Sequence, residues 1–465
     1  MNKIVCYELN EVPWRVVDRY LSSRPNSNLA KLIESSSSFT SSTIDSGELH
    51  PWSTWPTVHR GVHNDMHNIR SINQDLSTGI EFPPVWEILT DNEKTVGVFG
   101  SLQSHPPCAS ENMLFHIPDT FAPNSEVKPD IYQKFQEFNL KQAGENKAVA
   151  SKVSVKDVFY IGHLLRSGVR LGALVDIAKH LCKEKINPLN KARRPILQPV
   201  VGFDVFRNCL TKHKPEFCTF FSNHVAGIMH RYWKYTFPED FGYELASDKK
   251  DTFHKESILI AMDVFDSQLG WLQSFCKENS YDLVVCSSMG QEAIERDEYI
   301  PEIAVDNFEV LRQKINWTGS VELVPAMQPN VAFKFENRAD LTAFSSEILK
   351  LTDTEGEKIF SLAYEPVKNT LDLILGRSEI LCANRTVTYG EKSGDLSDFG
   401  LKLIERDIGT GYHQPEGIVI WHSAIEDKNS DRKRRVIDSR QILPEILHTF
   451  GIEPYEHHLE RFDRL

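Results

Sequence analysis

The sequence predicts an α/β/α sandwich with a mostly parallel central sheet. Short apolar runs that are typical of buried parallel strands recur along the chain, at residues 3–7, 95–99, 217–221, 283–286 and 417–421. Stretches with helical periodicity lie between or beside these runs, at residues 14–21, 28–34, 256–277 and 441–450. Because strands alternate with helices, we expect the strands to pair in parallel, with helices on both faces of the sheet.

The alternation of strands and helices also suggests how the chain is organised. The first strand ends in Glu8-Leu-Asn10, and the two helices after it lead into a serine-rich loop. The predicted divisions are an N-terminal part of the core (1–102), a mainly helical and basic insertion (103–212), a second part of the core (213–295), a second insertion (296–406) and a C-terminal part of the core (407–465). Both insertions are expected to cap a site at the edge of the sheet.

Composition excludes several classes of function. The formal net charge of -13 and the pI near 5.7 argue against nucleic acid as a partner, because a surface that follows phosphates should be basic. The eight cysteines are scattered and form no CxxC pair, as expected for free thiols in a reducing compartment. The sequence shows no signal peptide and no apolar run of about 20 residues that could span a bilayer. We expect a cytoplasmic protein, of an oligomeric state that the sequence does not indicate.

Polar residues follow the predicted strands at one edge of the sheet, where ligands bind in folds of this class. Each is ordinary by itself; a Thr before a helix, for example, is usually an N-cap. Their common location predicts a functional site. The five groups are Glu8 with Asn10; Thr54; Asn223, His224 and His230; Ser287-Ser288-Met289-Gly290; and residues 409–418, which include His413.

Thr54 is the candidate nucleophile. We expect it at the mouth of a strand, just before a helix begins, where free N–H groups and a positive dipole end face an incoming anion. His59, His63 and His67 are spaced by four residues and would share one helical face. A histidine of this group, His59 first, could then serve Thr54 as general base. The alternative is that these histidines are polar packing residues on a short helix.

These motifs resemble the alkaline phosphatase superfamily, especially its type I phosphodiesterases and nucleotide pyrophosphatases. Thr54-Trp-Pro56 is similar to the T-x-P step that carries the nucleophile of that branch, and residues 60–69 are similar to the T-G-x-x-P-x-x-H-G-I element after it. Residues 411–418 match the closing G-x-H-x-P-x-G-I segment, and residues 437–452 match the D-x-x-P-T-x-L-x-x-x-G-I helix. The resemblance implies an alkaline phosphatase-like fold with cap insertions.

The chain departs from this family where the family binds its two metal ions. The S-D-H-G segment reads Ser287-Ser288-Met289-Gly290, and Ala226 stands at the position of a ligand Asp. Ser and Met are poor ligands for Zn²⁺ or Mg²⁺ beside carboxylate and imidazole. The resemblance therefore implies a reduced metal complement.

The ligands that remain by resemblance suggest one divalent ion, Zn²⁺, Mn²⁺ or Mg²⁺. His230 and His413 match ligand positions, and Glu8 stands at the first Asp position. His224 is close enough in sequence to supply a third imidazole, and three histidines with an open position would suit a catalytic metal. The alternative is that Asn223, His224 and His230 only bond backbone and an anion.

The predicted function is hydrolysis or transfer at a phosphate ester, with a small phosphate-ester substrate. A diester is favoured, because a site with fewer metal charges suits a substrate of lower charge. Thr54 would attack in line to give a phospho-threonine, and Asn10 or Asn223 would stabilise the negative charge. The competing prediction is a non-catalytic protein of this fold that binds an anion or a partner.

Overall fold

The structure is a computed structural model, and it describes residues 2–72, 74–144, 162–295, 302–324, 331–365, 369–374, 376–377, 385–404, 409–424, 434–462 and 464. The chain forms two compact units. The first unit consists of residues 1–295 and 409–465, and the second of residues 296–408. No helix among the described residues is both long and apolar enough to cross a membrane.

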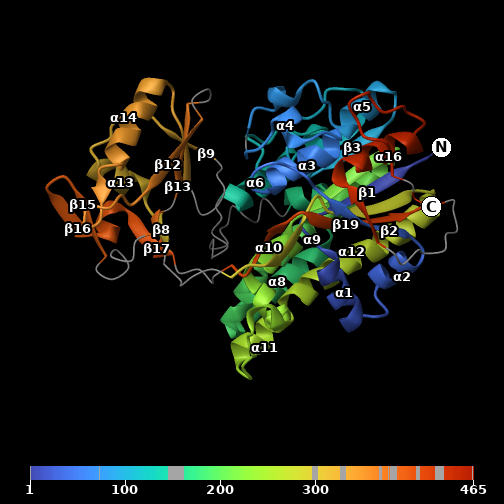
Figure 1. Ribbon diagram of the computed structural model, residues 1–465, viewed down its shortest axis with the longest axis horizontal. Helices are drawn as coiled ribbons and strands as arrows, with labels where there is room; N and C mark the ends of the chain where they lie inside the picture. The colour runs from blue at the N-terminus through green and yellow to red at the C-terminus, as the bar shows by residue number, and fades with distance from the viewer. Residues whose placement is uncertain are drawn as a thin grey trace. The chain divides into compact units, whose positions relative to one another are not determined.

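An eight-stranded sheet is the centre of the first unit (Figure 1). Its strands run in the order β20 (Arg435–Asp438), β2 (Ser37–Ser42), β19 (Glu416–His422), β6 (Asp282–Cys286), β1 (Ile4–Leu9), β5 (Phe217–Ser222), β3 (Val96–Phe99) and β4 (Met113–Ile117). Only β19 is antiparallel to its neighbours in this sheet, and the other pairs are parallel. The predicted fold class, α/β with a mostly parallel sheet, is confirmed.

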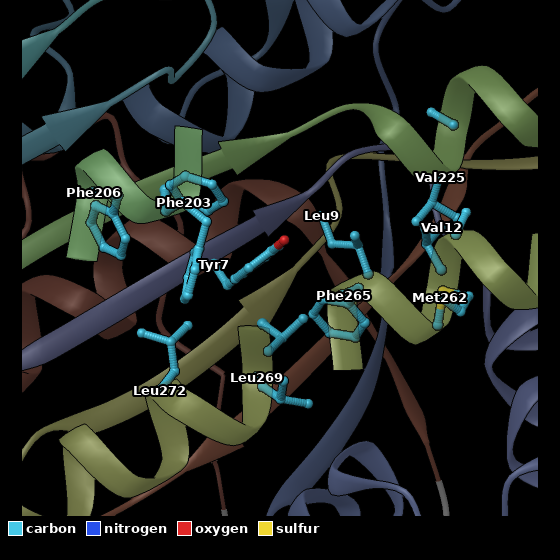
Figure 2. Close-up of a cluster of buried hydrophobic side chains, with 14 of the residues drawn as sticks. Tyr7, Leu9, Val12, Phe203, Phe206, Val225, Met262, Phe265, Leu269 and Leu272 are labelled. Carbon is cyan, nitrogen blue, oxygen red and sulfur yellow. The ribbon is translucent and has the colours of Figure 1, made fainter. Parts of the chain in front are cut away.

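Helices cover both faces of this sheet because successive side chains of a strand point to opposite faces. On one face, Tyr7 and Leu9 of β1 pack with side chains of the helices behind them, as Figure 2 shows. On the other face, Ile4 and Cys6 belong to a second core. The first layer contains α1 (Trp14–Ser23), α2 (Asn28–Glu34), α9 (Leu197–His213), α10 (His224–Thr236) and α12 (Ser257–Asn279); the second contains α3 (Pro51–Arg60), α5 (Val85–Asp91) and α16 (Ile442–Thr449).

Shorter elements complete the first unit. They are α4 (Asn64–His67), α6 (Gln133–Gly144), α8 (Leu171–Ile186), α11 (Lys249–Lys255), a 3₁₀ segment at Pro188–Ile196, and the strands β7 (Gly290–Ala293) and β18 (Gly411–Gln414). The antiparallel pair β7 and β18 brings Ala293 opposite Gly411. The two chain segments that lead into and out of the second unit therefore start side by side.

Two elements differ from the sequence prediction. The serine-rich segment forms the strand β2 rather than a loop, since it pairs along its length with β19 and with β20. The range 103–212 is not wholly an insertion, because it contains β4, which pairs with β3 at the edge of the sheet. Tertiary pairing thus overrides the weak strand signal of β2, whereas β4 is a mainly apolar run that the sequence prediction did not assign to the sheet.

The second unit has its own hydrophobic core, which includes Phe333 and Phe344. Its largest sheet has the order β12-β13-β10-β9 and is antiparallel. Its role as a cap stays a prediction. The elements are β8 (Glu302–Val305), α13 (Phe308–Lys314), β9 (Glu322–Val324), β10 (Val331–Lys334), α14 (Arg338–Ile348), β11 (Leu351–Thr352), β12 (Ser361–Glu365), β13 (Thr370–Ile374), β14 (Gly376–Arg377), β15 (Thr386–Tyr389), β16 (Lys392–Asp395) and β17 (Leu401–Ile404).

Candidate functional site

Three potential metal ligands meet beyond the carboxyl ends of the central strands. Glu11 follows β1, His230 lies in α10 and His413 lies in β18. Each offers one ligand atom, and the three atoms all lie within 4.8 Å of one another. Glu11 Oε2 is 3.0 Å from His230 Nε2 and 3.5 Å from His413 Nε2. Within the described part of the chain, no other His, Cys, Asp and Glu side chains form such a group of three.

Surrounding hydrogen bonds hold His230 and Glu11 in place. His230 Nδ1 donates to the carbonyl of Gly411 at 2.9 Å, which leaves Nε2 facing Glu11. Glu11 accepts hydrogen bonds from Asn10 Nδ2 at 2.8 Å and from Gln291 Nε2. A histidine that donates through one ring nitrogen to a backbone carbonyl and presents the other is the usual arrangement around a metal. Two imidazoles and a carboxylate suit Zn²⁺ and Mn²⁺ better than Mg²⁺.

Glu11 and His413 shift each other's protonation. Burial by itself raises the pKa of Glu11, but His230 and His413 more than offset it and hold that pKa well below its ordinary value. Burial likewise lowers the pKa of His413, and the neighbouring Glu11 carboxylate overcomes this effect and raises it. The Glu11 carboxylate therefore favours the protonated form of His413 in the absence of metal. A divalent cation among the three donors would take the place of that proton.

Thr54 lies inside α3, and the expectation that it precedes the helix is wrong. The helix begins at Pro51, with His50 as N-cap, and the N–H groups of Ser53 and Thr54 both donate to the His50 carbonyl at 3.0 Å. The side chain of Thr54 is fully buried, and its Oγ1 lies 2.8 Å from Ser288 Oγ. The N–H of Thr54 is thus used within the helix rather than presented to an anion.

The N-terminus of α3 nevertheless adjoins the metal-ligand group. The ring of His50 lies edge-on to that of His413, with 5.5 Å between their centres. Burial, and then the neighbouring His413, lower the pKa of His50, so this imidazole is neutral at pH 7. The positive end of the α3 dipole lies in this region and would favour an anion there.

Hydrogen bonds of Asn10 and Asn223 link three elements: the end of β1, the start of α10, and α3. Asn10 Nδ2 donates to Asn223 Oδ1 at 2.7 Å, and Asn10 Oδ1 accepts from Trp55 Nε1 at 2.7 Å. With the bond to Glu11, both amide hydrogens of Asn10 have partners. Asn10 thus positions Glu11 and α3, and an oxyanion would have to compete for its N–H groups.

The structure does not bring Glu8 and His59 to the metal-ligand group. Glu8 Oε1 lies 2.8 Å from His59 Nε2, and both side chains are buried between β1 and α3. The His59 ring stacks on Trp55, with ring centres 5.5 Å apart. His59 is five residues after Thr54 in one helix, so the two side chains lie about 140° apart around its axis. The pair anchors α3 on the sheet, and the structure does not place His59 as a base for Thr54.

His224 is also outside the metal-ligand group. Its Nδ1 lies 2.8 Å from Ser222 Oγ, and its Nε2 lies 2.9 Å from the carbonyl of Ala261. Burial lowers the pKa of His224 to about 4, so the ring is neutral at physiological pH. His224 thus fixes the start of α10 instead of presenting a ligand atom.

His59, His63 and His67 do not share a helical face. The helix α3 ends at Gly61, whose φ of 63° lies in the left-handed region. His63 is the N-cap of α4, and His67 Nε2 lies 3.0 Å from Thr57 Oγ1. Burial lowers the pKa of His67 to about 3. His59 and His67 thus pack against buried side chains, as in the alternative prediction, whereas His63 caps α4, a role that was not predicted.

Glu11 is the candidate site residue that the sequence analysis did not predict. Alternate residues of a strand share a face, so Glu8 and Asn10 were the natural candidates after β1. Glu11 has a φ of 59°, and this turn redirects its side chain toward His230. The available signal was a second carboxylate directly after the strand, in Glu8-Leu-Asn-Glu11.

Comparisons with known proteins give likenesses of structure only. No protein-family model matches the chain, and no curated protein matches it by sequence. Murine ectonucleotide pyrophosphatase/phosphodiesterase 5 has a similar structure, with a TM-score of 0.42, 12% identity and coverage of 98% of this chain and 97% of that chain. Phosphonoacetate hydrolase from Sinorhizobium meliloti 1021, in complex with phosphonoacetate, has a TM-score of 0.40 and 12% identity, with coverage of 96% of this chain and 95% of that chain. A mutant alkaline phosphatase has a TM-score of 0.44 and 12% identity, with coverage of 99% of this chain and 98% of that chain. The similar solved structures thus include a phosphodiesterase, a phosphonoacetate hydrolase and an alkaline phosphatase.

Proposed function

We propose that this chain hydrolyses or transfers a phosphate ester with the help of one divalent ion held by Glu11, His230 and His413. The observation that carries the proposal is the convergence of these three ligand atoms within 4.8 Å from three distant parts of the sequence. They lie where parallel-sheet proteins bind ligands, beyond the carboxyl ends of the strands. When bound, the ion would polarise a phosphoryl oxygen and offset its negative charge.

Thr54 remains the proposed nucleophile. Its oxygen would bond to phosphorus as the ester oxygen departs in line with it, and the hydroxyl proton would pass to that departing oxygen. Water or an acceptor hydroxyl would then cleave the phospho-threonine and return a proton to Thr54. Ser288 Oγ lies 2.8 Å from the Thr54 hydroxyl oxygen and orients that hydroxyl. Because Thr54 is fully buried, α3 or its surroundings must open before a substrate reaches it. One ion favours a diester, which has one negative charge to neutralise.

The test is a comparison of two variants on a nitrophenyl phosphodiester in the presence of Zn²⁺ or Mn²⁺. Thr54→Val keeps the shape of the side chain and should retain metal binding while the rate falls by about 100-fold or more. Glu11→Gln should lose metal binding and turnover together. Full activity of Thr54→Val would reject the nucleophile, and turnover that is independent of added or retained metal would reject the metal-assisted mechanism.

A second candidate is a non-catalytic protein that binds an anion at this site. It is favoured by the burial of Thr54 and its bond to Ser288, in a segment without metal ligands. This candidate predicts metal binding and metal-dependent binding of AMP, the ligand found in one structure of the murine phosphodiesterase, without turnover of any ester. Calorimetry with AMP, combined with a turnover assay of the same metal-loaded protein on a nitrophenyl phosphodiester, separates the two functions.

A further inference from the structure

The helix α8 presents apolar side chains to solvent. Leu171 is 68% exposed, Val175 50% and Ile186 85%. Ala178 and Cys182 are exposed as well. These five residues have the spacing i, i+4, i+7, i+11 and i+15, so they form one continuous stripe along the whole helix. We call them the α8 stripe.

The opposite side of α8 is already packed. Ala173 is buried, and Leu174 and Ile177 pack against the core beside the central sheet. An ordinary surface helix has one apolar face toward the core and a polar face toward water. The α8 stripe is therefore a second apolar face, and the packing of the first unit does not account for it.

Lysines border the α8 stripe on both sides. Lys179 and Lys183 lie along one edge, Lys185 lies along the other, and all three are exposed. Residues 162–194 contain eight Lys and Arg and two Asp and Glu, although the whole chain has a formal net charge of -13. One of the two acidic residues, Glu184, is buried and paired with Arg194. The region is thus a basic surface on an acidic protein.

The flanking charge decides which partner suits this surface. A second copy of the chain would place lysine against lysine around a shared apolar stripe, which is unfavourable. An anionic lipid surface satisfies both features, because the stripe enters the boundary between headgroups and acyl chains while lysine ammonium groups extend to the phosphates. We propose that α8 attaches the protein peripherally to a membrane surface that contains anionic phospholipid.

The first test measures binding to vesicles by co-sedimentation. The protein should bind vesicles of phosphatidylcholine with phosphatidylglycerol and should not bind vesicles of phosphatidylcholine alone. Replacing Leu171 and Val175 with Asn should weaken binding by about tenfold or more, because it removes the apolar part of the contact. Lys183→Gln should weaken binding by about fivefold, the effect of one lysine near an anionic surface. The matched control is Ile80→Asn, since Ile80 is 77% exposed outside the α8 stripe.

The second test locates the contact. Cys182 is an exposed residue of the α8 stripe, so it accepts an environment-sensitive fluorophore when Cys108 and Cys382 are replaced with serine. Its emission should shift to the blue with anionic vesicles and stay unchanged with neutral ones. Equal binding to neutral vesicles, no binding at all, or equal losses in the Ile80 control would overturn the proposal. Self-association that the Leu171 and Val175 substitutions abolish, without lipid binding, would assign the surface to a second copy instead.

Discussion

At the scale of single residues, two glutamates three positions apart differ in role: Glu8 is structural, and Glu11 is the proposed metal ligand. Glu8 contacts His59 beneath α3, whereas Glu11 contacts His230 and His413. Glu11→Gln removes the anionic ligand and should lower the affinity for Zn²⁺ or Mn²⁺ at least about tenfold, the effect expected from loss of a group in a metal's coordination sphere. Isothermal titration calorimetry at constant pH measures the change.

Glu8→Gln is the matched control for this prediction. The Gln side chain keeps an oxygen or nitrogen that can hydrogen-bond His59, so α3 should stay in place and metal affinity should change less than about twofold. If Glu8→Gln abolishes metal binding and Glu11→Gln does not, the ligand is Glu8, as the family resemblance implied, and the Glu11 group is only an ion pair.

The affinity for metal should also depend on pH with a known sign. The folded-state pKa of His413 lies above its ordinary value because of Glu11, so below that pKa the metal must displace a proton. Affinity should therefore rise as pH increases from 6 toward 8 and then level off. The stability of the metal-free protein should instead fall as pH increases. The ion pair contributes stability below the unfolded-state pKa of His413, near 6.5, and this contribution is lost as pH rises through the raised pKa.

Calorimetry in buffers of different ionisation enthalpy counts the proton released. A release near one proton per ion at the lower pH, falling at the higher pH, supports the displacement of the His413 proton. Affinity that stays constant over this range would mean that His413 is not a ligand. Glu11 does not contribute to the trend, because its lowered pKa keeps it ionised throughout.

At the scale of elements, a strand was predictable where its own residues are apolar. The strand β6, Asp-Leu-Val-Val-Cys, is a continuous apolar run after its first residue, and burial on both faces requires such a run. The strand β2, Ser-Ser-Phe-Thr-Ser-Ser, is formed by its backbone bonds to β19 and β20, and no local pattern shows these partners. The start of α3 at Pro51 follows a known preference for Pro in the first helical turn, and this signal lies three residues before Thr54.

The candidate site was predictable from the sequence only for residues that follow from the ends of predicted strands or from the motif resemblance. His230 and His413 follow from the edge of the sheet and from the motif resemblance, and the structure brings both together. Glu11 does not follow, because a non-glycine residue with positive φ is uncommon and the strand pattern places its side chain on the other face. The burial of Glu8 with His59 likewise depends on how α3 lies across β1.

The contact between α3 and β1 gives a prediction about stability. Asn10→Ala leaves the indole N–H of Trp55, which is fully buried, without its acceptor. The free energy of unfolding should fall by about 1–3 kcal/mol, the cost of a buried polar group without a partner. Urea denaturation monitored by fluorescence measures it. The losses of stability in the single variants Asn10→Ala and Trp55→Phe should sum to more than the loss in the double variant, because the same bond can be lost only once. Strict additivity would show that Asn10 does not bond Trp55.

At the scale of the whole molecule, the three proposed ligands belong to one compact unit although the chain leaves that unit between them. Glu11 and His230 precede the second unit, and His413 follows it. The junction is closed by the pairing of β7 with β18 and by the bond from the N–H of Ile294 to the carbonyl of Thr410 at 3.0 Å. The geometry at His413 therefore depends on this junction, which holds β18 against the first unit.

This arrangement predicts that residues 296–408 can be replaced by a short Gly/Ser linker without loss of the metal site. The ends are already adjacent in the β7–β18 pair, and closing a short loop there costs less conformational entropy than closing a long one. The shortened protein should unfold cooperatively and bind Zn²⁺ or Mn²⁺ within about threefold of the full chain, because both forms keep the same ligands and the same core. Circular dichroism and calorimetry provide the two measurements. A folded product that has lost metal affinity would show that the second unit completes the site, whereas retained affinity with altered turnover of the phosphodiester would assign that unit to the substrate.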